Sequence, residues 1–91
     1  MRFTWDENKR RSNVGKHGFD FVDAFQVFDG ATFTFEDNRY AYGEQRFITL
    51  GLLGGRVVVL AHTEVADEIH VISMREGTKR EKIIFFQSLS N

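Results

Sequence analysis

The chain has 91 residues and a mass of 10.6 kDa, which is enough for one small domain and excludes a second. Its content of 42% hydrophobic and 14% aromatic residues excludes a disordered chain, and no stretch approaches the ~20 uncharged apolar residues of a membrane span. The absence of cysteine excludes disulfides and thiolate metal sites, so we expect a single cytoplasmic domain over residues 1–91.

The formal net charge of −1 argues against a molecule that attracts nucleic acid as a whole. The charge is nevertheless uneven along the chain. Residues 1–17 carry five basic and two acidic groups, residues 18–74 carry three and nine, and residues 75–82 carry four and two. If the two ends meet in the fold, they form a local cationic surface that can bind phosphate on a slightly acidic molecule.

The N-terminal third is predicted to form a strand followed by two helices. Phe3–Trp5 alternates apolar and polar residues, and Asp6 offers an N-cap for a polar helix over about Glu7–Lys16. Val14 is the only clear apolar anchor of that helix. A second helix begins near Asp20, and we expect its core face to consist of Phe21, Ala24, Phe25 and Phe28.

The remainder is predicted to form four strands and a terminal helix. The expected strands are Thr32–Phe35, Glu44–Leu53, Arg56–His62 and Glu68–Met74, with a hairpin turn at Gly54 and Gly55 and an acidic loop over Thr63–Asp67. Thr78 and Glu81 form a capping box that opens a helix to about Leu89. The order βααββββα predicts an α+β fold, with helices packed around one twisted, mainly antiparallel sheet.

One face of the first predicted helix carries a polar stripe. It places Lys9, Asn13, Lys16 and His17 at positions i, i+4, i+7 and i+8. Such groups suit a phosphodiester site, because lysine neutralises phosphate charge and histidine exchanges a proton close to neutrality. The alternative is a solvated helix face with cations in its last turn, which is common.

Arg46 and Arg75 are expected to project from neighbouring strands toward one face, where two guanidinium groups could hold a phosphate. Ordinary surface pairing with the acidic middle segment is the alternative. Arg80 and Glu81 lie in the first turn of the last helix, and Glu81 is more simply a cap partner than a base.

For the other candidate residues a structural role is the simpler expectation. Trp5 could stack a nucleobase, but core packing is the simpler expectation. His62 and His70 have no carboxylate or cysteine at ligand spacing, and the glycines do not follow a phosphate-binding pattern. We therefore expect neither a metal ion nor a nucleotide cofactor.

Three stretches of the sequence form a longer pattern. The first contains Phe3, Trp5–Glu7, Lys9, Asn13, Lys16–Gly18, Phe21 and Ala24; the second contains Gly43, Glu44, Arg46, Phe47 and Gly51; the third contains Ile72–Arg75, Gly77, Thr78 and Glu81. This pattern covers nearly the full length and resembles the BrnT toxin family. The resemblance implies a RelE-like fold, a ribonuclease that arrests translation, and a ribbon-helix-helix antitoxin, BrnA, whose complex with the toxin binds its own promoter DNA.

The sequence departs from the family pattern at two positions. It has Gly77 where many members have alanine, and Phe85 where they have tyrosine. If that tyrosine hydroxyl aids the chemistry in relatives, Phe85 removes it here.

Because the resemblance implies a ribonuclease and the candidate residues suit a phosphodiester site, we predict RNA cleavage without a metal ion, in which the 2′-hydroxyl attacks the adjacent phosphorus and leaves a 2′,3′-cyclic phosphate. The expected catalytic residues are His17 as acid or base, the cations Lys16, Arg46 and Arg75, and Glu81 as base or orienter. Expected RNA contacts are Lys9, Asn13, Arg80 and Trp5. A rival interpretation is a non-catalytic subunit whose cations bind the antitoxin or promoter DNA.

The last predicted helix is apolar on more than one face, over Ile83–Phe86, which indicates a second burial partner. We expect the antitoxin to cover Ile84, Phe85 and Leu89 on this helix. Because ribbon-helix-helix proteins dimerise, the expected assembly contains two toxins and two antitoxins.

Overall fold

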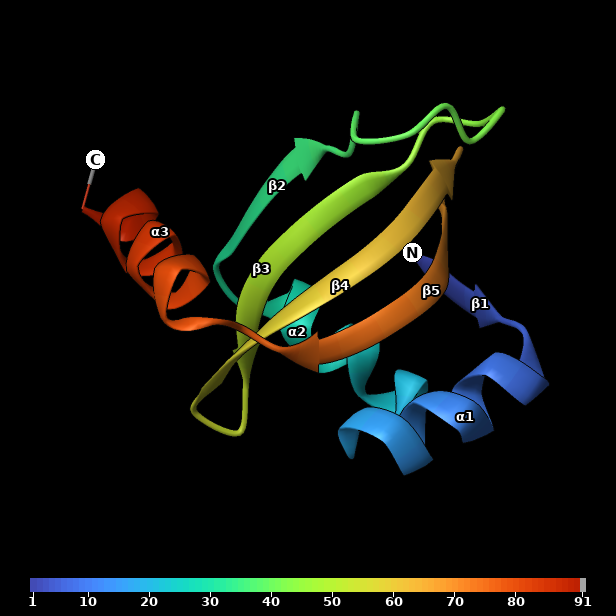
Figure 1. Ribbon diagram of the computed structural model, residues 1–91, viewed down its shortest axis with the longest axis horizontal. Helices are drawn as coiled ribbons and strands as arrows, with labels where there is room; N and C mark the ends of the chain where they lie inside the picture. The colour runs from blue at the N-terminus through green and yellow to red at the C-terminus, as the bar shows by residue number, and fades with distance from the viewer. Residues whose placement is uncertain (91) are drawn as a thin grey trace.

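One five-stranded sheet and three α-helices make up residues 1–90, which this computed structural model describes (Figure 1). The elements are β1 (Arg2–Trp5), α1 (Glu7–His17), the 3₁₀ turn η1 (Phe21–Asp23), α2 (Ala24–Asp29), β2 (Thr32–Glu36), β3 (Phe47–Leu53), β4 (Arg56–Val65), β5 (Glu68–Glu76) and α3 (Lys79–Leu89). The predicted α+β class and element order are confirmed. Within residues 1–90 we find no helix with the length and apolar character needed to cross a membrane.

The sheet has the strand order β1-β5-β4-β3-β2. The strands β2 to β5 pair antiparallel in succession, whereas β1 runs parallel to β5 at the opposite edge. Gly54 and Gly55 form the predicted turn between β3 and β4, with φ angles of 58° and 78° that favour glycine. β3 begins at Phe47 rather than at Glu44, and β4 runs on to Val65, so the predicted acidic loop is only a tight turn.

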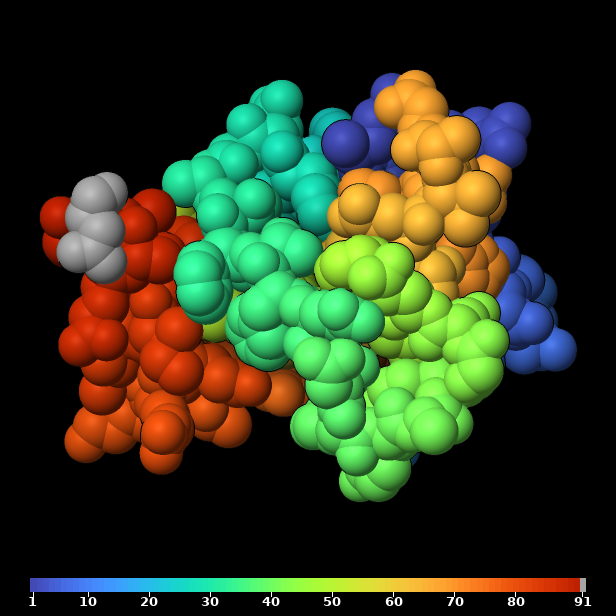
Figure 2. Space-filling model, turned by 90° about the horizontal axis from the view of Figure 1, so that it is seen from above, coloured from blue at the N-terminus to red at the C-terminus, as the bar shows by residue number. Residues whose placement is uncertain are grey.

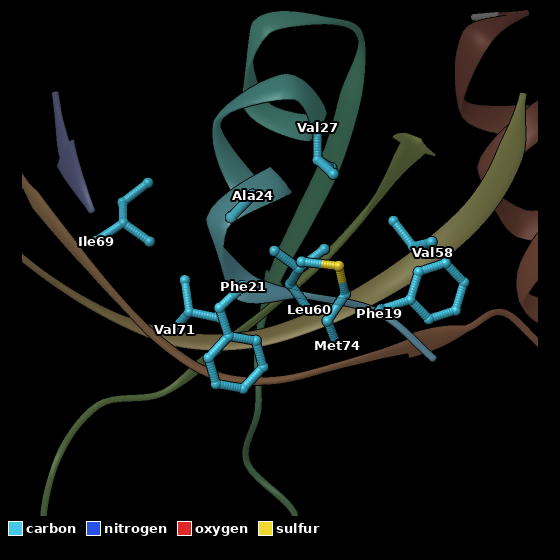
Figure 3. Packing of buried hydrophobic residues seen from close by; sticks show 9 residues of the cluster. All are labelled: Phe19, Phe21, Ala24, Val27, Val58, Leu60, Ile69, Val71 and Met74. Carbon is cyan, nitrogen blue, oxygen red and sulfur yellow. The ribbon is translucent and has the colours of Figure 1, made fainter. Parts of the chain in front are cut away.

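The segment from η1 through α2 covers one face of the sheet, and Figure 3 shows the buried cluster between them. Phe21, Ala24 and Val27 are fully buried there. Phe25 was predicted for this core but is 55% exposed. The physical reason is the 3₁₀ turn, which repeats every three residues instead of 3.6 and so shifts the buried face to Val27.

α3 packs against β2 and β3 on the opposite face of the sheet. The predicted capping box at its start is confirmed, with both hydrogen bonds present. Phe85 is fully buried against Ile48, Leu50, Val57 and Val59. The prediction that Phe85 lies on an exposed face is therefore wrong, whereas Leu89 is 49% exposed and Ile84 is half-buried.

α1 is attached to β5 by a polar side chain. Asn13 is buried, and its Nδ2 donates to the carbonyl oxygens of Phe19 at 2.9 Å and Met74 at 2.8 Å. Its Oδ1 accepts the backbone N–H of Met74 at 3.1 Å. Val14, the predicted anchor, is 39% exposed. The β1 ladder ends at Val71, so the Asn13 amide satisfies backbone groups of β5 beyond that point.

Candidate functional site

Arg75 and Glu81 form a two-point ion pair where β5 ends and α3 begins. Arg75 Nη1 lies 2.7 Å from Glu81 Oε1, and Nη2 lies 2.9 Å from Oε2. The capping box fixes the carboxylate, because Oε1 also accepts the backbone N–H of Thr78 at 2.8 Å. The hydrogen bonds from Arg75 lower the pKa of Glu81 to about 2. At neutral pH Glu81 is therefore an anion that orients Arg75 and is a weak base.

This ion pair lines a hollow of about 210 Å³ on the face of the sheet that carries α3. Phe35 and Ile48 form an apolar wall, and the chain after β2 contributes Arg39. The pKa of Arg75 is raised chiefly by its hydrogen bonds with Glu81, and the nearby charge of Arg39 opposes that rise. Two guanidinium groups therefore face one hollow, but the second is Arg39 and not the predicted Arg46.

A buried carboxylate holds Arg39 in place. The Asp37 carboxylate accepts three hydrogen bonds from Arg39, from the backbone N–H at 3.2 Å, from Nε at 2.8 Å and from Nη2 at 3.0 Å. The Tyr42 hydroxyl donates to the same carboxylate at 3.0 Å. These bonds hold the pKa of Asp37 well below its usual range, and those from the Arg39 side chain have the largest effect. Sequence reasoning missed Arg39, and the only available signal was the Asp-x-Arg spacing in a polar loop.

Arg46 does not lie beside Arg75. It precedes β3, where its guanidinium stacks 4.0 Å from the ring centroid of Tyr42, and its Nε lies 3.4 Å from Glu44 Oε1. The prediction that the two arginines project from neighbouring strands is wrong, because β4 separates β3 from β5. Arg46 thus packs against the loop that also contains Arg39.

A second hollow, of about 170 Å³, lies between α1 and β5. Lys9, Lys16 and His17 line it from α1, and Ser73 belongs to its β5 side. The predicted stripe is thus gathered around one surface feature. Asn13 also lines it, but its buried amide is bonded to Phe19 and Met74, so it fastens α1 to β5 instead of being free to contact RNA.

Both hollows include residues of β5. Ser73 belongs to the α1 hollow and Arg75 to the α3 hollow. Residues two apart on a strand point to the same face and lie about 7 Å from each other. The two hollows therefore border neighbouring parts of β5, and they hold basic residues from both ends of the chain.

The remaining predicted residues lie away from the two hollows. Trp5 is half-buried and packs against the core on the α2 side of the sheet, in agreement with the expectation of core packing. Arg80 is exposed in the first turn of α3 and lines neither hollow. Within residues 1–90 there is no group of three or more His, Cys, Asp or Glu side chains that could hold a metal ion.

Comparison with known families identifies the chain. Residues 5–81 match the family model described as ribonuclease toxin, BrnT, of type II toxin-antitoxin system. The matched range contains both hollows and the Arg75–Glu81 pair, and it ends before Ile84, Phe85 and Leu89. A search of curated proteins gives no match. Because the family model covers most of its length, the chain belongs to the BrnT family of ribonuclease toxins of type II toxin–antitoxin systems.

Proposed function

We propose that this chain cleaves RNA without a metal ion and thereby inhibits translation in the cytoplasm. In the proposed reaction the 2′-hydroxyl gives its proton to a base and attacks the adjacent phosphorus in line. The bond to the 5′-oxygen breaks, and that oxygen takes a proton from an acid. The products are a 2′,3′-cyclic phosphate and a free 5′-hydroxyl, so no co-reactant is consumed.

The roles follow the placement of each side chain. His17, exposed at the end of α1, serves as acid or base. Lys16 and Lys9, in the same hollow, neutralise the RNA backbone. Arg75 stabilises the charge that develops on phosphorus oxygens, and Glu81 is a positioning residue for Arg75. Arg39 adds a second guanidinium, and Arg46 and Arg80 contact RNA farther out.

One observation carries this proposal: both hollows border β5, one through Ser73 and the other through Arg75, two residues farther along the strand. The first hollow holds an imidazole and two ammonium groups, and the second holds an arginine that makes two hydrogen bonds to Glu81. In-line displacement requires proton transfer and charge stabilisation at adjacent oxygens, and this surface offers both. The antiparallel run β2–β5 beneath it supports the RelE-like architecture that the family resemblance implies.

We infer that a ribbon-helix-helix antitoxin neutralises the toxin in a two-plus-two complex that binds promoter DNA. The outer side of α3 supports a contact there. Ile83 is 50% exposed and Phe86 52% exposed, beside Lys79 and Lys82 on a groove of about 420 Å³. Apolar anchors of this kind usually dominate protein interfaces. Phe86→Asp should therefore weaken the complex more than Lys79→Ala does.

Catalysis is tested with purified protein, end-labelled RNA and EDTA, scoring fragment ends for cyclic phosphate. His17→Ala should slow cleavage by about 10²–10⁴-fold and Arg75→Ala by about 10²–10³-fold. The matched control is Arg11→Ala, a cation on α1 whose side chain is 71% exposed and lines neither hollow. Its rate should stay within about twofold of wild type.

Each result has a defined meaning. Cleavage that EDTA abolishes would refute the metal-free mechanism. Cleavage that survives in both site variants would refute the assigned residues. If the wild-type chain cuts neither naked RNA nor RNA on translating ribosomes, catalysis itself is refuted and the non-catalytic binding subunit becomes the better explanation.

A further inference from the structure

β2 is a sheet edge with unused backbone groups. It is the last strand of the sheet in residues 1–90, and Asp37 N–H donates to Arg46 O at 2.8 Å just beyond it. In an antiparallel pair the inward and outward backbone groups alternate. Counting back from Asp37, the N–H and C=O groups of Phe35 and Phe33 point to β3, so those of Thr32, Thr34 and Glu36 point away from the sheet.

The opposite edge is protected, and β2 is not. β1 is only four residues long and begins with Arg2, which is ion-paired to Glu68. Beyond β1, Asn13 satisfies the backbone of β5 at Met74. Such short strands, charges and covering groups are the usual protection of an edge. All five residues of β2 are exposed, and only Glu36 is charged.

Two phenylalanines give this edge an exposed apolar surface. Phe33 is 37% exposed and Phe35 is 44% exposed, and their ring centroids lie 5.8 Å apart on one side of the strand. In Figure 2 the segment around β2 lies at the surface, between α3 and the loop that follows β2. An extended segment with apolar residues at alternate positions would pair with this backbone and bury both rings.

We propose that β2 accepts an extended segment of the antitoxin as an additional, sixth strand of the sheet. The inference rests on the proposed function, in which an antitoxin blocks the RNA site. Phe35 and Glu36 belong both to the edge and to the wall of the hollow that contains Arg75. A strand on β2 therefore lies at the rim of that hollow, whereas a partner on the outer side of α3 alone does not.

The same geometry defines the chemistry of the segment. It carries apolar side chains at alternate positions, which lie on Phe33 and Phe35. It also carries a carboxylate at the position that reaches the hollow, because Arg39 and Arg75 each retain donor N–H groups beyond those given to Asp37 and Glu81. An apolar or basic side chain there would offer those donors no acceptor, and a carboxylate also balances the two positive charges.

Amide hydrogen exchange of the full chain, alone and in complex with its full-length antitoxin, tests the inference residue by residue. In the free chain the amides of Thr34 and Glu36 should exchange rapidly, and those of Phe33 and Phe35 slowly. In the complex Thr34 and Glu36 should slow by at least about tenfold. The amide of Gly55, in the turn between β3 and β4, is the reference that should not change.

A matched pair of variants tests the contribution of the side chains. Phe33→Lys should weaken antitoxin binding by about tenfold or more. Phe25, on α2, is 55% exposed, and Phe25→Lys should change the affinity for the antitoxin by less than about twofold. Far-UV circular dichroism checks that both variants fold, and the exchange measurement on the wild-type chain does not depend on either variant.

The outcomes separate this inference from the proposed function. A stable complex in which Thr34 and Glu36 still exchange rapidly refutes the inference and leaves the antitoxin assignment intact. Protection of these amides in the chain alone, with a doubled mass in solution, also refutes it and assigns the edge to a second copy. Failure to form any complex refutes the antitoxin assignment and the inference together.

Discussion

Replacing Asn13 with alanine tests how α1 is fastened to the sheet. The substitution removes three hydrogen bonds and leaves the backbone groups of Phe19 and Met74 without their partner. At about 1 kcal/mol for each bond, the free energy of unfolding should fall by about 3 kcal/mol. For a domain of this size that corresponds to a decrease in Tm of roughly 12–24 °C.

The control is Asn8→Ala, an exposed asparagine on the same helix. Both substitutions replace asparagine with the better helix former alanine on the same helix, so a much larger loss at Asn13 reports its buried hydrogen bonds. Urea and thermal unfolding, followed by circular dichroism, give both quantities. Because domains are stable by about 5–15 kcal/mol, Asn13→Ala should still fold at 25 °C, where its RNA cleavage can be measured.

Two results would contradict this reasoning. If Asn13→Ala and Asn8→Ala unfold at the same urea concentration, the Asn13 amide does not hold α1. If Asn13→Ala keeps wild-type stability but loses cleavage, Asn13 contacts RNA directly, as the sequence alone predicted.

Three further predictions concern α3, the ion pair and the end of α1. Phe85→Ala should cost about 3–5 kcal/mol of stability in urea unfolding, and Phe86→Ala, at a half-exposed ring, much less; equal losses would contradict the burial of Phe85. The folded pKa of Glu81, about 2, is below its unfolded value near 4.5, so the stability that its pair with Arg75 adds is present above pH 4.5 and lost as the pH falls toward 2. Glu81→Gln should therefore lose about 2 kcal/mol at pH 7 and progressively less as the pH falls from 4.5 toward 2, and a pH-independent loss would refute the ion pair as its cause. Gly18→Ala should cost about 1 kcal/mol in thermal unfolding, because φ is 77° there; no loss would show that the helix end relaxes.

Local rules predicted much of the fold. The capping box at Thr78 and the turn at Gly54 and Gly55 depend on neighbouring residues alone, and both are as predicted. Phe25 was misplaced because one 3₁₀ turn changes the helical phase, and the sequence pattern gives no sign of that turn. Phe85 was misplaced because four consecutive apolar residues do not indicate which side of a helix is buried.

The candidate site was predictable where it follows one helix. Lys9, Lys16 and His17 gather because α1 is regular. Arg39 was missed because its bond to Asp37 is local, whereas its place beside Arg75 depends on the fold of segments far apart in the chain. The pairing of Arg46 with Arg75 failed for a related reason: strand order is a property of the whole sheet and cannot be read from spacing along the chain.

The parallel pairing of β1 with β5 has a consequence for synthesis of the toxin. Thr4 and His70, which meet in that pair, are 66 residues apart, so a growing chain cannot close the sheet until β5 has emerged. α1 carries His17 and Lys16, and Asn13 bonds it to β5 at Met74, which Arg75 follows directly. A product that stops before β5 therefore lacks both Arg75 and the contact of Asn13 with Met74, so the proposed site cannot assemble until β5 has been synthesised.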